Sequence, residues 1–218
     1  MHILPEKFYD RPTLEVARDL IGKHLVRVLD DGTELSGRIV ETEAYTQDDP
    51  AFHGWGILDR ETGLLKPEGR GRDLFGKPGT AYVYLTYGVH WLMNVVTERE
   101  GIGGGVLLRA AEPLGGIDSM YERRASARSD IDLANGPGKL AQAFAIAGTL
   151  HNTSITRPPL YVRESGATGR PAVETSCRIG ITRGAELPWR FYAPDNPYVS
   201  RGAPSDIVQA RKRGKVSA

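Results

Sequence analysis

Two runs of strand-forming residues, 24–29 and 34–45, stand on either side of the short segment Asp30-Asp31-Gly32-Thr33. Aspartate and glycine favour a tight turn, because both tolerate the backbone angles that a short hairpin loop requires. The two runs are therefore predicted to pair as an antiparallel β-hairpin. A sheet that starts in this way needs no crossover helix between its first two strands.

The remaining elements follow from the same kind of pattern. Helices are predicted over 13–21 with Gly22 as the stop, near 117–124, and over 137–147 with Pro137 at the first position. Strands rich in β-branched and aromatic residues are predicted at 81–87, 91–96, 106–111, 160–163 and 178–182. Short turns between strands, with helices grouped elsewhere, favour an α+β domain over repeated βαβ units. We expect one domain over 1–203, a mixed, mostly antiparallel curved sheet with surrounding helices, followed by a loose basic tail over 204–218.

Composition excludes several classes of protein. Hydrophobic residues make up 40% and charged residues 25% of the chain, an ordinary mixture for a folded domain. The single cysteine, Cys177, rules out an internal disulfide and a cysteine-based zinc site, and fits a reducing compartment. No segment approaches the roughly 20 apolar residues needed to cross a bilayer, and residues 1–10 lack a signal core. We expect a monomer without a membrane partner, in the bacterial cytoplasm and associated with the nucleoid.

The distribution of charge is more informative than its sum. The formal net charge is only +1, which argues against a strongly basic nucleic-acid binder. Basic residues nevertheless gather in 66–77, which includes Arg70 and Arg72, in 123–128 and in 211–215. Each cluster could meet phosphate, although solvated surface charge is the ordinary explanation for any one cluster alone. The Gly-rich, charged stretch 54–79 is long enough to predict a functional loop.

Two carboxylates are predicted to share one face of a strand. The period of two in a strand places Glu41, Glu43 and Tyr45 on one side of the run 38–45. Neighbouring acids can shift each other's titration and act as a general base or nucleophile. Most such pairs are solvated strand edge, and the motif taken alone favours that plainer interpretation.

A lone arginine interrupts the apolar run 105–113. A buried guanidinium without a partner is very costly, so Arg109 should face a carboxylate or a phosphate. Glu43 is the partner that would make the arginine functional. A purely structural ion pair with Glu41 or Glu112 is the alternative.

The stretch 82–91 is unusually aromatic and contains Gly88, where a chain can turn sharply. Tyr82 and Tyr84 share one strand face, whereas Tyr87 has the opposite parity and lies beside the glycine. Aromatic rings stack on bases with about 1–3 kcal/mol each, enough for a few rings to hold a flipped base. Tyrosines in a strand are as often part of the core or the sheet surface.

Several catalytic classes lack their motifs. His53 and His90 have no partner at the spacing of a zincin, so a metal site is not expected. Neither a phosphate loop of the Walker type nor a Gly-x-Ser-x-Gly elbow occurs. Lys139 stands at the start of a predicted helix, where a nucleophilic lysine, an anion site or a solvated side chain are all compatible with the sequence.

A set of segments in a fixed order resembles the alkyladenine (3-methyladenine) DNA glycosylase family and spans about residues 4–200. The segments are Arg38 to Tyr45, Lys77-Pro78-Gly79-Thr80-Ala81-Tyr82-Val83-Tyr84, Tyr87-Gly88, Met93-Asn94, Leu107-Leu108-Arg109-Ala110, Glu112-Pro113-Leu114, Gly136-Pro137-Gly138-Lys139-Leu140 and Leu187-Pro188-Trp189-Arg190-Phe191-Tyr192. The resemblance implies a monofunctional enzyme that flips a damaged purine out of double-stranded DNA and hydrolyses its N-glycosidic bond with water. It implies no metal, no cofactor and no covalent lysine intermediate.

The resemblance also implies a role for each matching residue. Glu43 resembles the general base, and Arg109 the side chain that helps to hold the water. Tyr87 resembles the residue that intercalates into the duplex in place of the base. The substrate-binding residues implied are Tyr45, His53 and Tyr84, as walls for the flipped base, and Asn94, at the pocket floor. DNA contacts are expected from Arg70, Arg72 and Lys139.

The chain departs from the family pattern in the loop 53–77, which is longer than usual and lacks an Arg-Thr-x-Arg segment; Arg70-Gly71-Arg72 stands near its place. Phe52 also replaces the small residue that often precedes the histidine, and His90-Trp91 lies where relatives differ. Two other hypotheses fit some residues. A non-catalytic nucleic-acid-binding module would use the same aromatic and basic residues, and a glycoside hydrolase would use Glu41 and Glu43 about 5 to 9 Å apart.

Overall fold

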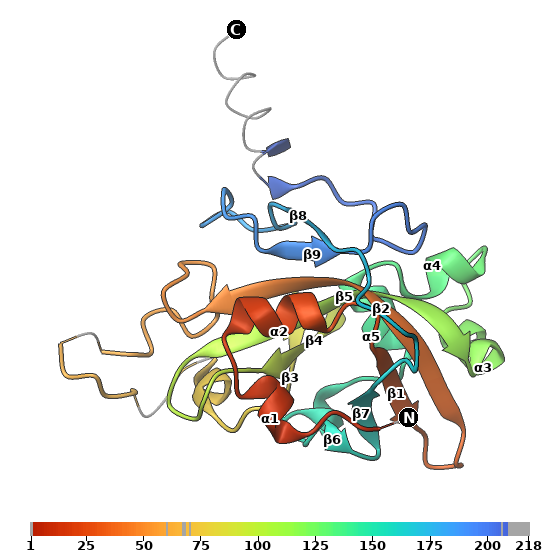
Figure 1. Ribbon diagram of the computed structural model, residues 1–218, viewed down its shortest axis with the longest axis horizontal. Helices are drawn as coiled ribbons and strands as arrows, with labels where there is room; N and C mark the ends of the chain where they lie inside the picture. The colour runs from red at the N-terminus through yellow and green to blue at the C-terminus, as the bar shows by residue number, and fades with distance from the viewer. Residues whose placement is uncertain (1, 60, 67–68, 70, 206, 209–218) are drawn as a thin grey trace, which may run out of the picture.

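The computed structural model describes residues 2–59, 61–66, 69, 71–205 and 207–208 (Figure 1). Within these residues, nine strands form one sheet whose main path runs β3-β4-β5-β2-β1-β7-β6, with β9 pairing with β2 and β8. Every ladder between these strands is antiparallel. The strands are β1 (His24–Val28), β2 (Glu34–Thr46), β3 (Ala81–Thr86), β4 (His90–Val96), β5 (Gly104–Gly115), β6 (Thr156–Arg157), β7 (Leu160–Arg163), β8 (Glu174–Ser176) and β9 (Arg190–Tyr192).

Short helices lie around this sheet. Helix α2 packs against β2, and α5 packs against β4 and β5. Figure 1 shows α1 and α2 in front of the sheet and α3 and α4 at its right-hand end. Strands β8 and β9 of the same sheet are drawn above β2. The helices are α1 (Glu6–Tyr9), α2 (Thr13–Asp19), α3 (Ile117–Arg123), α4 (Asp130–Ala134) and α5 (Pro137–Ala143), with 3-10 turns at Arg72–Phe75 and Gly148–Leu150. The predicted α+β class and curved antiparallel sheet are confirmed.

The first hairpin forms as its turn residues predict. The Thr33 N–H donates to Oδ1 of Asp31 at 2.9 Å, and Gly32 has φ +85°, a conformation that glycine adopts without strain. Strands β1 and β2 then pair from Val28 opposite Glu34 to His24 opposite Arg38.

Strand β2 is the central element, and two of the three register shifts in its pairing with β5 are bulges close to Glu41. Its first half pairs with β1, residues 41–43 pair with β9, and its other edge pairs with β5 along most of its length. Against β5, Ile39 lies opposite Ala111 but Glu41 lies opposite Ala110, so residue 40 is extra on β2; Thr42 then lies opposite Leu108, so residue 109 is extra on β5. Bulges bend a strand and redirect side chains. The second bulge places Arg109 next to the two glutamates.

Three expectations need correction. Residues 178–182 are not a strand, because Gly180 has φ +77° and the Ile179 N–H donates to a glutamate side chain rather than to a neighbouring strand. The helix predicted to reach residue 147 ends at Ala143, shortly before Ala145 takes φ +51°. Helices α1 and α4 and strands β6, β8 and β9 were not predicted, because each has only two to five residues.

The main core lies on the face of the sheet that carries α2 and α5. It combines apolar residues of β2, β4 and β5, such as Ile39, Met93 and Leu108, with Val16 and Phe144 from the helical side. In the described part of the chain, no helix is both long and apolar enough to span a bilayer. The proposed boundary near Ala203 and the basic tail stay predictions, because most of 204–218 lies outside the described residues.

Candidate active site

A cavity of about 630 Å³ opens between the sheet, the start of α5 and the segment 179–181. The lining brings together residues that are far apart in the sequence. Seven of the predicted site residues line it: Tyr45, His53, Tyr84, Tyr87, Asn94, Arg109 and Lys139. A pocket of this size is typical for a small organic ligand.

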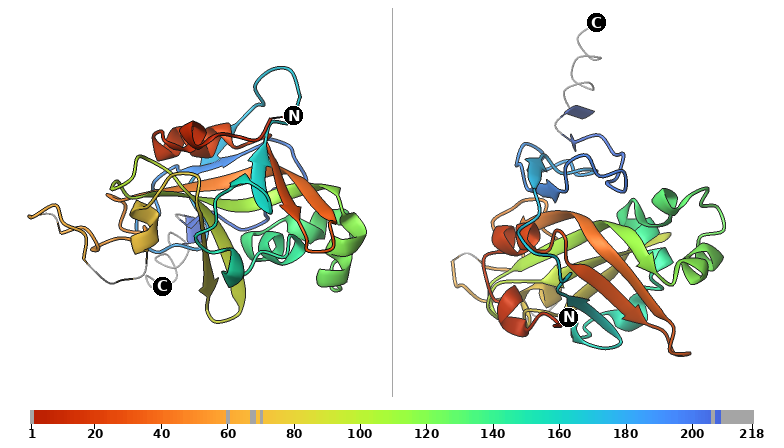
Figure 2. Two further views of the ribbon diagram at one scale, coloured as in Figure 1. Left: turned by 90° about the horizontal axis from the view of Figure 1, so that it is seen from below. Right: turned by 45° about the vertical axis from the view of Figure 1, so that its right-hand side comes forward.

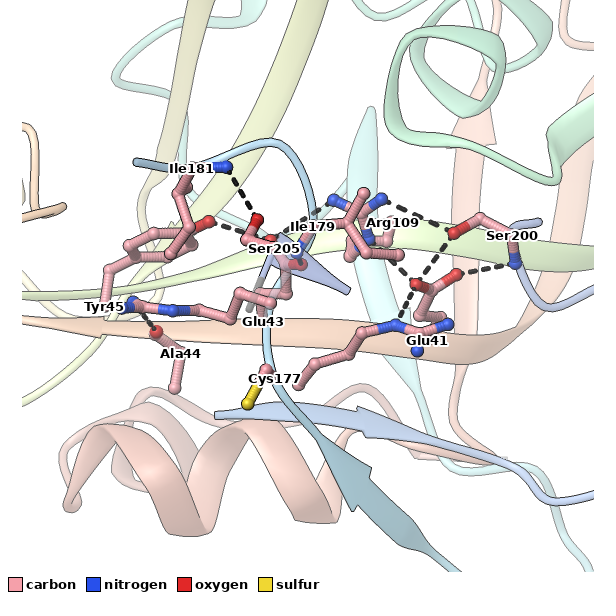
Figure 3. Close-up of polar contacts among 12 residues, drawn as sticks. Glu41, Glu43, Ala44, Tyr45, Arg109, Cys177, Ile179, Ile181, Ser200 and Ser205 are labelled. Carbon is pink, nitrogen blue, oxygen red and sulfur yellow. Dashed lines mark hydrogen bonds and ion pairs between the residues drawn. The ribbon is translucent and has the colours of Figure 1, made fainter. Parts of the chain in front are cut away.

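Glu43 is fully buried and is not itself part of the cavity lining. Its Oε2 accepts the Tyr45 hydroxyl at 2.7 Å and faces Nη1 of Arg109 at 3.2 Å, and its Oε1 accepts the Ile179 N–H at 2.7 Å. All three partners also line the cavity. Figure 3 shows the carboxylate among them, above β2. Glu43 is therefore held by three residues of the cavity wall and lies directly behind them.

Glu41 shares this face of β2 but has a different environment. Its Oε1 accepts Nε of Arg109 at 2.8 Å, Nε of Arg190 at 2.6 Å and the Ser200 hydroxyl at 2.9 Å, and its Oε2 accepts the Ser200 N–H at 2.8 Å. Burial raises the pKa of Glu41, but the charges of Arg109 and Arg190 and the hydrogen bonds from Arg190 and Ser200 leave it below its ordinary value. Both oxygens of Glu41 are therefore already engaged by protein donors.

Arg109 joins the two carboxylates. It is 5% exposed, with Nε on Glu41 and Nη1 on Glu43. Burial lowers the pKa of Arg109, but the charges of Glu43 and Glu41 leave it above its ordinary value. Of the three carboxylates considered from the sequence, Glu43 and Glu41 contact Arg109, whereas Glu112 pairs with Arg38. The solvated-edge interpretation of the acidic pair is wrong, because both glutamates have no exposed surface.

The Tyr45 hydroxyl is a fixed donor in this arrangement. Burial, followed by the negative charge of Glu43, raises the pKa of Tyr45 well above its ordinary value. The hydroxyl therefore stays protonated and donates a hydrogen bond to Glu43. The guanidinium of Arg178 lies over the Tyr45 ring, 4.5 Å from its centroid.

Aromatic side chains form one wall of the cavity. The rings of His53 and Tyr84 meet edge to face at 4.4 Å, and Tyr82 packs behind them, 5.5 Å from Tyr84. His53 Nδ1 and the Tyr82 hydroxyl are 3.3 Å apart. Tyr82 is 3% exposed, so of the two tyrosines on this strand face it is Tyr84 that is available to a ligand.

Tyr87 lies at the tip of the β3–β4 hairpin and points away from the protein. It is 93% exposed, and it takes φ +49° beside Gly88 at φ +69°. In the left-hand view of Figure 2 this yellow-green hairpin projects from the body of the molecule. An exposed aromatic ring in a strained turn needs a reason outside the isolated fold, because such backbone strain costs about 1–3 kcal/mol.

The three residues predicted to contact DNA lie in different places. Lys139 lies at the rim of the cavity, where its Nζ donates to Asn135 at 2.7 Å and lies 3.6 Å from Asp132. Arg72 is exposed, bonds to the Lys66 carbonyl and is outside the cavity lining. Arg70 lies outside the described residues.

Sequence reasoning missed several residues that hold the site. Arg190 and Ser200 hold Glu41, and the Ile179 N–H holds Glu43. Arg178 has no exposed surface and pairs with Asp49. The sequence feature that could have identified the two buried arginines is a charged residue next to apolar ones. Among the described residues, no three His, Cys, Asp or Glu side chains gather as a metal site would require.

Comparison with known proteins identifies the family. The sequence profile of the methylpurine-DNA glycosylase family matches residues 7–197. A protein of Salinibacter ruber is 53% identical over 94% of this chain and 100% of its own length, and one of Chlorobaculum parvum is 45% identical over 97% and 98%. A protein of Methanocella arvoryzae is 44% identical over 95% and 100%. All three are named as candidate 3-methyladenine DNA glycosylases. The chain belongs to the methylpurine-DNA glycosylase family and is a DNA glycosylase.

Proposed function

We propose that this enzyme captures a damaged purine in the cavity and hydrolyses its N-glycosidic bond with a water activated by Glu43. The substrates proposed are 3-methyladenine, 7-methylguanine, hypoxanthine and ethenoadenine. One observation carries the proposal: the fully buried Glu43 is bonded to Tyr45, Arg109 and Ile179, three residues that line an aromatic-walled cavity of about 630 Å³. A buried carboxylate with specific partners in the wall of a pocket is a candidate general base.

The chemistry assigned to Glu43 is proton removal. Its Oε1 accepts one N–H, and a carboxylate oxygen has two acceptor sites, so Oε1 can also accept from a water. The water oxygen attacks C1′ of the deoxyribose, one of its protons passes to Glu43, and the base leaves with the electron pair of the C–N bond. Arg109 and the Tyr45 hydroxyl hold the carboxylate in place during this step.

Base recognition is assigned to the cavity walls. Tyr84 and His53 offer aromatic surface, Tyr45 closes the side next to Glu43, and Asn94 supplies a buried amide. Alkylation or loss of the exocyclic amine weakens pairing or improves the leaving group, so damaged purines are easier to flip and to release.

The alternatives are less compatible with these contacts. A glycosidase pair needs Glu41 as a second working carboxylate, but two arginines and Ser200 already occupy it. A nucleophilic lysine needs its nitrogen free to attack, whereas Nζ of Lys139 donates to Asn135 at 2.7 Å and lies 3.6 Å from Asp132. We assign Lys139 to phosphate contact. A non-catalytic module would have no use for a buried glutamate behind the wall of its pocket.

The hairpin supports duplex DNA as the partner. A ring at the tip, 93% exposed, can fill the space that a flipped base leaves in the stack, a role that single-stranded DNA does not require. One copy of the chain supplies cavity, hairpin and rim cation, so we propose a monomer. We propose the bacterial nucleoid as its place of action, because that is where its DNA substrate lies.

Excision should not need a divalent metal. We expect duplexes with one hypoxanthine or one alkylated adenine to lose that base when incubated with the enzyme and a chelator. The abasic sites are then cleaved with alkali and the strands separated. Breaks that appear only after alkali are the expected result, and their relative rates rank the substrates. Breaks without alkali would indicate a lyase with a covalent lysine, and tight binding without breaks a binding module.

Tyr87→Ala should weaken capture of the flipped base. The expected loss is about 1–3 kcal/mol, or roughly 5- to 150-fold in the flipping equilibrium, because one stacking ring is removed. Fluorescence of ethenoadenine in a duplex reports its unstacking. Tyr87→Phe keeps the ring and should behave as the wild type. An unchanged equilibrium in Tyr87→Ala would exclude Tyr87 from this role.

A further inference from the structure

We infer that Arg178, with its partner Asp49, is a positioning residue that sets the orientation of Glu43. This inference rests on the proposed function, in which Glu43 is the general base. Two of the three partners of Glu43 are in direct contact with Arg178. Ile179, whose N–H binds Oε1, is the next residue along the chain, and the Tyr45 ring lies under the guanidinium.

The guanidinium of Arg178 ties three separate segments together. Nη1 donates to the Ala44 carbonyl at 2.9 Å, on the strand between Glu43 and Tyr45, and it also bonds to Asp49. Nη2 donates to Oδ1 of Asp49 at 3.0 Å and to the Gly184 carbonyl at 3.0 Å. The side chain therefore fixes β2, the turn that follows β2, and the far end of the loop 178–184 against one another.

The loop that Arg178 closes has few other supports. Residues 178–184 form no strand, so ladder hydrogen bonds do not hold them. Their further contacts include the Ser205 N–H on the Arg178 carbonyl at 2.8 Å and the Ile181 N–H on the Ser205 hydroxyl at 3.1 Å. Ile179, Gly180 and Ile181 line the cavity. Without the Arg178 side chain, the position of the Ile179 N–H would depend on β8, which ends at Ser176, and on the contacts with Ser205.

The effect of Arg178 on Glu43 is geometric rather than electrostatic. Arg178 and Asp49 have no exposed side-chain surface, and Asp49 compensates the charge of the arginine. The positive charge at Glu43 comes instead from Arg109, which binds it directly. A misplacement of about 1 Å at a catalytic group can lower a rate by about 10²-fold without touching the substrate.

The decisive experiment is a double-mutant cycle under single-turnover conditions, with a hypoxanthine duplex as the substrate. Arg178→Met should lower the excision rate by on the order of 10²-fold, with a change of no more than about threefold in the Kd for a duplex that carries an abasic-site analogue. Asp49→Asn should act in the same direction. Arg178→Lys should be intermediate, because one ammonium cannot bridge Asp49 and both carbonyls in the fixed geometry of a guanidinium.

The cycle separates a positioning role from a general loss of stability. In a Glu43→Gln background, Arg178→Met should cause almost no further loss, since both changes act on the same carboxylate. Leu160→Ala, in the core of β7 away from the cavity, is the control for lost stability and should keep the wild-type rate below its unfolding temperature. Independent, additive losses, or a wild-type rate in folded Arg178→Lys and Asp49→Asn, would overturn the inference. If Glu43→Gln itself cleaves at the wild-type rate, the proposed function fails instead.

Discussion

Glu43→Gln is expected to lower the single-turnover rate of base excision by about 10²- to 10⁴-fold while the variant still binds damaged duplex. Glutamine has the shape of glutamate but cannot take a proton from water at neutral pH. Its carbonyl can still accept the Ile179 N–H and its amide can donate to the oxygen of Tyr45, whereas the contact with Nη1 of Arg109 is lost. The site should therefore stay folded and lose its chemistry.

The measurement pairs rapid-quench excision with a binding titration on the same hypoxanthine duplex. Glu112→Gln is the matched control, because Glu112 lies in the same sheet and pairs with Arg38 outside the cavity lining. Its excision rate should equal that of the wild type. Wild-type excision by Glu43→Gln would remove the general base from the mechanism. Loss of excision together with loss of binding would assign Glu43 to capture of the base instead.

The parts of the fold that could be predicted are those that depend on neighbouring residues. The turn Asp30-Asp31-Gly32-Thr33 contains within itself the Asp31 to Thr33 hydrogen bond that forms it, so the first hairpin needs no other information. The alternation along 38–45 likewise places Glu41, Glu43 and Tyr45 on the face that Arg109 contacts. Such local patterns do not depend on which other elements pack against them.

The parts that could not be predicted depend on contacts between distant segments. Residues 178–182 have the composition of a strand, yet Arg178 and Ile179 find their partners on β2 and Asp49, more than a hundred residues earlier. Whether the acidic pair is solvent-exposed or buried likewise depends on β9 and on Ser200, which cover it. Seven of the residues that the resemblance singled out line the cavity, but the resemblance did not predict the second set of buried charges, Arg178 and Asp49.

Arg109→Met is expected to lower the free energy of unfolding by about 3–5 kcal/mol, because it leaves two buried carboxylates without their shared cation. Arg190 and Ser200 still hold Glu41, and Tyr45 and the Ile179 N–H still hold Glu43, so we expect the lower end of that range.

Arg38→Met is the matched comparison for Arg109→Met. It breaks an ion pair of 3.1 Å on the same two strands, but the Arg38 side chain is 46% exposed, so the loss should be at most about 1 kcal/mol. Urea unfolding followed by circular dichroism gives both values. The double variant Glu43→Gln/Arg109→Met should lose less than the sum of its single changes, because one of the stranded charges is gone. Equal losses from Arg109→Met and Arg38→Met would mean that the buried pair contributes to stability no more than a surface pair does.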